Sequence, residues 1–184
     1  MNAVRKFAGL AAVVALTVAA LLVGRWFVGD SSEQAGATSS VDVPGVAAPP
    51  TVGQPAPAFT ADALDGRVDV GGEGQPTWVV FMASWCQECR VEAPDVQTAH
   101  EGRGDVRIVA VYLGEDEATV RGYADRLGLT FAAVPDPDQR LAARYGVRSV
   151  PTHVFIGADG VVRDLAFGAL SEAGIREKLD ALTQ

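Results

Sequence analysis

An α/β fold with a central mixed β-sheet flanked by helices is predicted by three features of this sequence. Residues 78–82 and 107–112 are short apolar runs rich in β-branched and aromatic residues, typical of central strands buried on both faces. A segment with helical spacing follows each run, so crossovers join the strands and make them parallel. Further along, an Asp-Gly pair separates apolar runs at 153–156 and 161–165 and indicates an antiparallel hairpin.

The helices are predicted in chain order from their spacing and caps. The first begins at residues 86–89, and the second covers residues 120–127, where apolar residues recur at helical intervals. A short third helix is expected over residues 141–145. Ser171 is a suitable N-cap for a final helix whose apolar face includes Leu179. The order of elements is therefore strand, helix, strand, helix, strand, strand, helix, with the short third helix before the hairpin.

Length and charge limit the domain count and the kinds of partner. The chain has 184 residues and a mass of 19.2 kDa, enough for one ordinary domain and an appendage. Its net charge at pH 7 is −8, and no run of Lys and Arg follows residue 50. Because phosphate binding needs clustered cations, the sequence argues against nucleic acid as a partner.

The N-terminal region is predicted to anchor the protein in a membrane. Arg5 and Lys6 precede an apolar, uncharged run, so residues 1–28 are expected to form a signal-anchor helix with a cytoplasmic N-terminus. A cleaved signal peptide is the alternative, and it would export the body as well. Residues 29–50 are rich in Gly, Ser, Ala and Pro and are expected to be a flexible linker before a folded domain at residues 51–184.

Two cysteines, Cys86 and Cys89, are the candidate catalytic pair. A bridge between residues so close in sequence closes almost no chain, so it contributes little as a structural cross-link. Cys86 is expected at a helix N-terminus, where the backbone N–H groups and the helix dipole favour a thiolate. Cys89 lies one turn further along on the same face. We therefore expect Cys86 to be the nucleophile and Cys89 the resolving thiol.

Around these cysteines the chain resembles the TlpA/ResA/CcmG-like membrane-anchored reductases of the thioredoxin superfamily, over about residues 53–182. The matching segments are residues 53–59, Asp65-Gly66, Trp85-Cys86-x-x-Cys89, Pro94 and Val150-Pro151-Thr152. The resemblance implies a thioredoxin-like fold, without a bound cofactor, on the outer side of a bacterial cell membrane. It implies reduction of exported protein disulfides, often those of apocytochrome c, with electrons from a membrane thiol transporter.

The same resemblance assigns roles to residues beside the dithiol. It implies that a cis bond precedes Pro151 and that the proline packs beside the cysteines, leaving the backbone of Val150 free to pair with a substrate strand. An ordinary trans proline is the alternative. Trp85 resembles the exposed ring that the family carries beside the dithiol, and a partly buried core residue is its alternative.

Two departures from the family pattern bear on the mechanism. Val80 stands where many thioredoxins carry a buried acid that takes the proton of the resolving thiol, so another group or water must move that proton. Glu88 sets a carboxylate beside the nucleophile, which raises the pKa of Cys86 and favours a reducing dithiol. Glu88 is also a candidate proton relay, or else a solvated first-turn residue. Glu115 is a weaker relay candidate or a surface charge.

Two other functions fit parts of the sequence. His100 or His153 with the two thiolates would suit copper, as in a metallochaperone, but neither histidine lies in a local ligand pattern, so we expect no metal site. The same fold can also act as an oxidant that introduces disulfides. The reduction potential separates the directions, because about −270 mV is thioredoxin-like and about −120 mV is strongly oxidising.

Overall fold

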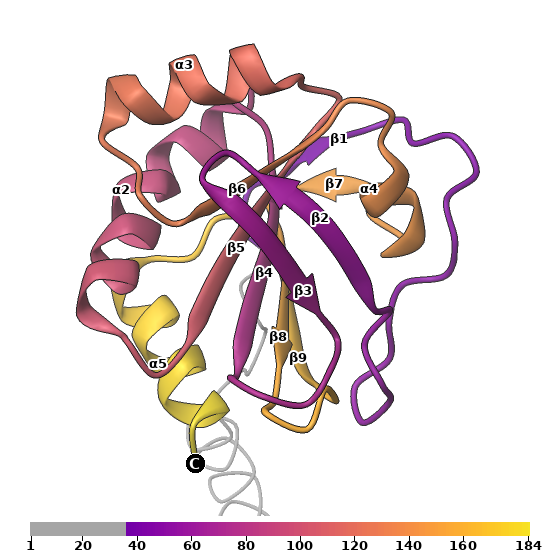
Figure 1. The fold of residues 1–184 in the computed structure, drawn as a ribbon, viewed down its shortest axis with the longest axis vertical. Coiled ribbons are helices and arrows are strands. Elements are labelled where there is room, and N and C mark those ends of the chain that lie inside the picture. The colour runs from indigo at the N-terminus through magenta and orange to yellow at the C-terminus, as the bar shows by residue number, and fades with distance from the viewer. Residues whose placement is uncertain (1–35) are drawn as a thin grey trace, which may run out of the picture. The chain divides into compact units, whose positions relative to one another are not determined.

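The computed structural model describes residues 36–184, in which a five-stranded mixed sheet forms the centre of the domain (Figure 1). The expected anchor at residues 1–28 lies outside the described residues. Within them, no helix is both long enough and apolar enough to cross a bilayer. In spatial order, the strands of the sheet are β6 (Ala132–Asp136), β5 (Arg107–Leu113), β4 (Thr77–Met82), β8 (Thr152–Ile156) and β9 (Val162–Phe167).

The central strand β4 leads directly into the cysteine motif. Every residue of β4 is buried, which confirms a strand covered on both faces. β4 pairs in parallel with β5 and antiparallel with β8, and β8 pairs antiparallel with β9. The predicted mixed sheet is therefore confirmed, with crossovers giving its parallel half and the Asp-Gly hairpin its antiparallel half.

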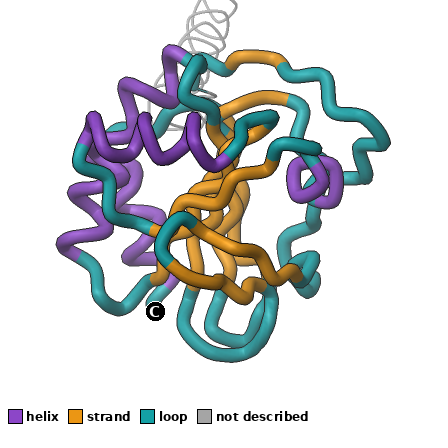
Figure 2. The backbone as a smooth tube through the Cα atoms, turned by 45° about the horizontal axis from the view of Figure 1, so that its top comes forward, coloured by secondary structure: helices purple, strands orange, loops and turns teal. Residues whose placement is uncertain are grey.

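Within residues 36–184, three long helices and one short helix flank the sheet. Figure 2 shows the long helices on one side of the strands in that view and the short α4 on the other. The helices are α2 (Gln87–Gly102), α3 (Glu117–Leu127), α4 (Arg140–Arg144) and α5 (Glu172–Leu182). Ser171 caps α5 as expected, since its hydroxyl accepts the Gly174 N–H at 3.2 Å.

Some strands were not predicted. β6 contains Pro135, which lacks a backbone N–H and fits the edge position that this strand occupies. A separate hairpin of β2 (Phe59–Ala63) and β3 (Gly66–Val70) turns at the Asp65-Gly66 pair. It contacts β6 where the Leu64 N–H donates to the Ala133 carbonyl at 2.8 Å. Exposed alternate positions in these short segments give only a weak apolar pattern.

The prediction of a flexible linker over residues 29–50 is wrong for residues 36–50, the part that the structure describes. Residues 36–50 lie along the domain instead of forming a tether, and they contain β1 (Ser39–Ser40), which pairs antiparallel with β7 (Ser149–Val150). Val43 is buried in the core. A composition of small residues and proline predicts a poor core but does not prevent a short segment from pairing with another strand.

Candidate active site

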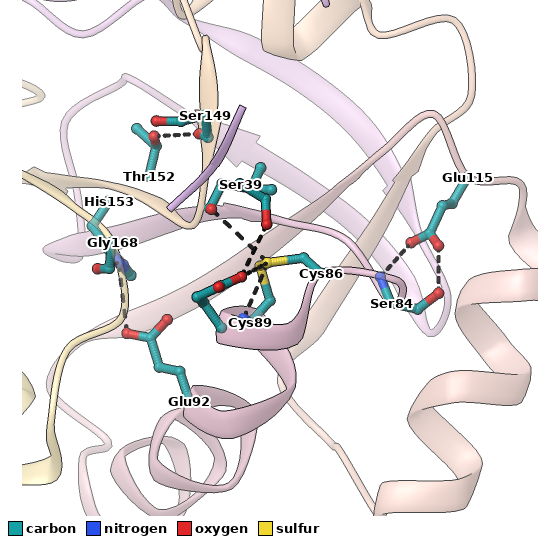
Figure 3. Close-up of a disulfide and its surroundings, with 12 residues drawn as sticks. Ser39, Ser84, Cys86, Cys89, Glu92, Glu115, Ser149, Thr152, His153 and Gly168 are labelled. Carbon is teal, nitrogen blue, oxygen red and sulfur yellow. Dashed lines mark hydrogen bonds and ion pairs between the residues drawn. A yellow bond between two sulfur atoms is a disulfide. The ribbon is translucent and has the colours of Figure 1, made fainter. Parts of the chain in front are cut away.

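Cys86 and Cys89 form a disulfide at the junction between β4 and α2 (Figure 3). Cys86 is the N-cap of α2, and its Sγ accepts the backbone N–H of Cys89 at 3.1 Å. Both side chains are buried, with Cys86 only 1% exposed. The predicted helix-terminal placement is therefore confirmed, and the Cys89 N–H that would stabilise a Cys86 thiolate points at its sulfur.

The turn that carries the cysteines is fixed by Glu115. Its carboxylate, which is buried, accepts the Ser84 N–H at 3.0 Å and also the Ser84 hydroxyl. Glu115 follows β5, so the neighbouring parallel strand holds the end of β4. The interpretation of Glu115 as surface charge is wrong. Its observed contacts are structural, because they link it to Ser84 and not to either sulfur.

The loop of Pro151 lies beside the disulfide. The Val150–Pro151 peptide bond is cis, as the resemblance implied. The Val150 carbonyl oxygen lies 3.9 Å from the Cys86 Sγ, and the Thr152 hydroxyl donates to the Ser149 carbonyl at 2.7 Å. The expectation of a free Val150 backbone is wrong for this structure, because Val150 pairs with Ser39 of β1.

Trp85 and Glu88 flank Cys86 on the more open side. Trp85 is 51% exposed, so the alternative of a core position is excluded. The Glu88 Oε2 atom lies 3.7 Å from the Cys86 Sγ and accepts the Ser39 hydroxyl at 2.9 Å. Glu88 is therefore beside the nucleophile, as expected, and close enough to accept a proton from a Cys86 thiol in the reduced protein.

A buried pair of titratable residues, Glu92 and His153, was missed by the sequence analysis. Glu92 lies three residues after Cys89 on α2, and its Oε1 lies 3.5 Å from His153 Nε2. Burial raises the pKa of Glu92 to about 8 and lowers that of His153 to about 4. Near pH 7 both side chains are therefore mostly neutral, and their contact is a polar pair rather than an ion pair.

The surroundings of this pair leave two polar atoms unused. The Leu170 N–H donates to Glu92 Oε1 at 2.9 Å, and His153 Nε2 lies 3.1 Å from the Gly168 carbonyl. Among the residues described, Glu92 Oε2 and His153 Nδ1 have no hydrogen-bond partner. His153 stands opposite Val80 in the β4–β8 register. The polar side chain beside Val80, where many thioredoxins carry an acid, is therefore His153 of the neighbouring strand β8.

One sequence signal pointed to Glu92. The buried residues of α2 recur at Cys89, Ala93 and Val96, and Glu92 falls on the same face. A charged residue in the apolar phase of a helix, one turn after a reactive cysteine, indicates a buried acid. His153 contributes to this pair, and His100 packs edge-on against Phe131. Over residues 36–184, no group of three or more His, Cys, Asp or Glu side chains is arranged to hold a metal ion.

The fold and the site define the class of this protein. A dithiol at the N-terminus of a helix after a buried central strand, next to a cis proline, is the arrangement of a thioredoxin-like thiol-disulfide redox protein. The chain belongs to the AhpC/TSA family, whose family model matches residues 52–165.

Similar proteins agree with this class. Thiol-disulfide oxidoreductase ResA of Geobacillus thermodenitrificans (strain NG80-2) is 32% identical over 138 residues, covering 71% of this chain and 78% of that relative. ResA of Bacillus subtilis (strain 168) is 28% identical, covering 71% of this chain and 75% of that relative. A secreted Mycobacterium tuberculosis disulfide oxidoreductase homologous to E. coli DsbE matches at 28% identity and TM-score 0.61, over 67% of this chain and 96% of that one. The chain is a thiol-disulfide oxidoreductase.

Proposed function

We propose that this chain is a membrane-anchored reductase of exported protein disulfides. The observation that carries the proposal is the Cys86–Cys89 pair, in which the Cys86 Sγ accepts a helix-terminal N–H at 3.1 Å and faces the Val150 carbonyl. The location is supported by Arg5 and Lys6 before the apolar N-terminal run. Apocytochrome c is the substrate class that the TlpA/ResA/CcmG-like resemblance supports.

The reaction is two exchanges of sulfur bonds. The Cys86 thiolate attacks one sulfur of the substrate disulfide, which breaks that bond and releases the other substrate sulfur as a thiolate. The Cys89 thiolate then attacks the Cys86 sulfur and releases the second substrate thiolate. The substrate gains two electrons and takes up two protons, and the protein is left with the Cys86–Cys89 disulfide seen in the structure. A membrane thiol donor then returns two electrons to it.

Glu92 is the group we propose for moving the proton of the resolving thiol. It replaces in function the acid that is absent at Val80, because it lies one helical turn from Cys89 and is buried. Burial raises the pKa of Glu92 to about 8, so the carboxyl exchanges a proton in the same pH range as a thiol. Glu88 has the corresponding position beside Cys86 and is exposed to solvent in part.

The charge beside the nucleophile favours the reducing direction. A carboxylate 3.7 Å from the Cys86 sulfur disfavours the thiolate and therefore the reduced form. A dithiol whose reduced form is less stable is the better electron donor. We expect a potential near the thioredoxin value of about −270 mV, and a value near about −120 mV would instead identify an oxidase.

Trapping the substrate tests the function directly. A Cys89→Ala protein cannot resolve the mixed disulfide, so it should accumulate covalent adducts with exported proteins when produced with its N-terminal segment. The Cys86→Ala variant is the matched control, because it keeps one cysteine but lacks the nucleophile. Adducts recovered only with Cys89→Ala, and released by reductant, support the proposal. Recovery of equal adducts with both variants, or of none, would contradict it.

A further inference from the structure

The edge of β7 beside the active site is occupied by the chain itself. Ser39 and Ser40 of β1 pair with Val150 and Ser149, so the strand immediately before the cis proline has an antiparallel partner from the N-terminal region (Figure 1). The pairing continues past β1, because the Val41 N–H donates to the Arg148 carbonyl at 3.0 Å. We call residues 36–43 the strap.

Side-chain and backbone contacts hold the strap at both ends. At its end, Val43 is buried in the core. At its start, Gly36 lies so close to the turn after β9 that an added Cβ would be 2.6 Å from the Ala169 carbonyl oxygen. In the middle, the Ser39 hydroxyl donates to Glu88 at 2.9 Å. The strap therefore follows a defined path across the active-site end of β7 and β9.

The strap lies beside a nucleophile that is too deeply buried for a protein substrate to reach. Cys86 is 1% exposed, and its Sγ lies 3.9 Å from the carbonyl of Val150, the residue that Ser39 opposes. A protein disulfide presented on an extended segment would add as a strand to this same edge, using the backbone groups of β7. The strap and such a substrate strand cannot both occupy the edge.

Ser39 shares a contact with the nucleophile. Its hydroxyl and the Cys86 sulfur both contact the same Glu88 oxygen, at 2.9 and 3.7 Å. Serine differs from cysteine only in having oxygen in place of sulfur, so the strap offers the nucleophile an unreactive analogue of a substrate cysteine. Ser40 follows on the opposite face of the strand, since successive side chains alternate.

We propose that the strap is an internal pseudosubstrate, which occupies the substrate-strand edge of β7 and must leave before Cys86 reacts. This inference rests on the proposed function, because it takes the β7 edge as the place where the substrate docks. The partner that fits the edge is an extended peptide with a small side chain opposite Val150, and the cysteine to be attacked stands there in place of Ser39.

The backbone pairing between the strap and β7 is short. It consists of two residue pairs and the Val41–Arg148 hydrogen bond, and an isolated two-stranded ladder is only marginally stable. Each net backbone hydrogen bond contributes about 0.5–1.5 kcal/mol, which a substrate strand making the same bonds can match. Substrate binds only to molecules whose strap has left the edge, so the apparent affinity for substrate is the intrinsic affinity multiplied by that open fraction. Release of the strap therefore activates the protein.

A cross-link tests where the strap lies without disturbing it. In a Cys89→Ala background of the full chain, Ser39→Cys is compared with the matched control Ser40→Cys. Two thiols give up two electrons to added oxidised glutathione, and the intramolecular disulfide with Cys86 is identified by peptide mass spectrometry. Because the two positions face opposite sides of the strand, we expect position 39 to cross-link at least about tenfold faster. Equal rates, or no cross-link at position 39, would overturn the proposal.

A steric wedge tests the consequence for reactivity. Gly36→Val places side-chain atoms against the Ala169 backbone and should undock the strap, whereas Ala37→Val changes an exposed neighbour. In the reduced full chain, Gly36→Val should raise both Cys86 alkylation by iodoacetamide and kcat/KM for insulin reduction at least about fivefold. Ala37→Val should leave both rates at the wild-type level. A Gly36→Val protein with native circular dichroism and wild-type rates would overturn the proposal.

The two readouts separate this inference from the proposed function. If wild type and Gly36→Val both fail to reduce insulin but the cross-link and the faster alkylation are found, the strap stands and the reductase function fails. If wild type reduces insulin, but position 39 has no cross-linking advantage and Gly36→Val has no faster alkylation, the function stands and the strap fails.

Discussion

Glu88 and Glu92 lie on successive turns of α2 and differ in surroundings. Glu88 is partly exposed and contacts the Cys86 sulfur and the Ser39 hydroxyl. Glu92 is buried against His153, and burial raises its pKa to about 8. The two carboxylates therefore differ in environment: Glu88 reaches solvent and the nucleophile, whereas burial keeps Glu92 mostly neutral near pH 7.

The largest expected effect is on the pH dependence of the free energy of unfolding when Glu92 is replaced. The pKa of Glu92 is raised in the folded state, so its contribution to stability is complete below about pH 4.5 and is lost as pH rises toward 8. Glu92→Gln, which cannot ionise, should be close to wild type at pH 4.5 and more stable at pH 8 by about 3–5 kcal/mol. Urea unfolding at both pH values measures this.

Glu88→Gln is the matched control for that measurement, since it makes the same change one turn earlier. Its effect on the free energy of unfolding should vary by less than about 0.5 kcal/mol between the two pH values. His153 acts in the opposite direction, because burial lowers its pKa to about 4 and stability is lost as pH falls from 6.5 toward 4. Equal pH dependence of the free energy of unfolding in Glu92→Gln and Glu88→Gln would contradict the proposed difference between the two carboxylates.

A smaller loss of stability is expected at the turn that carries the dithiol. Glu115→Ala removes the acceptor of the Ser84 N–H and hydroxyl in a buried position. Leaving such groups unpaired should lower the free energy of unfolding by about 1–3 kcal/mol, measured in urea. Glu117→Ala, at the exposed start of α3, should cost less than about 0.5 kcal/mol. A loss at Glu115 no larger than at Glu117 would show that its carboxylate does not support the turn.

The smallest expected effect is on the reduction potential. Glu88→Gln removes the negative charge beside Cys86 and should raise the potential by about 10–30 mV, equivalent to about 0.5–1.4 kcal/mol. Glu101→Gln, about 20 Å further along α2, should leave it unchanged. Equilibration with glutathione followed by thiol counting provides the measurement. A potential that falls in Glu88→Gln would contradict the proposed effect of this charge.

Much of the central sheet and the reactive pair could be predicted from the sequence. The buried runs that form β4 and β5 are continuous, so they indicate strands without tertiary information. Cys86 and Cys89 were identified because their spacing and their place after a strand describe a local structure. Trp85 and the cis bond before Pro151 followed from the family resemblance and agree with the structure.

The rest of the site depends on contacts between distant segments. The Glu92–His153 pair joins a helix to a strand from another part of the chain, so neither residue alone indicates the contact. Composition does not predict the pairing of Ser39 with Val150. A segment of small polar residues is usually a linker, and it becomes a strand here only because β7 offers unpaired backbone groups. Tertiary packing, rather than local propensity, determined both.

The most direct test of the account is the rate of insulin reduction by wild type and by Cys86→Ala, with dithiothreitol as electron donor at pH 7. Because Cys86 forms the covalent intermediate, its removal should lower the rate above the dithiothreitol background by at least about a thousandfold. A Cys86→Ala protein that reduces insulin at the wild-type rate would contradict the assignment of Cys86 as the nucleophile.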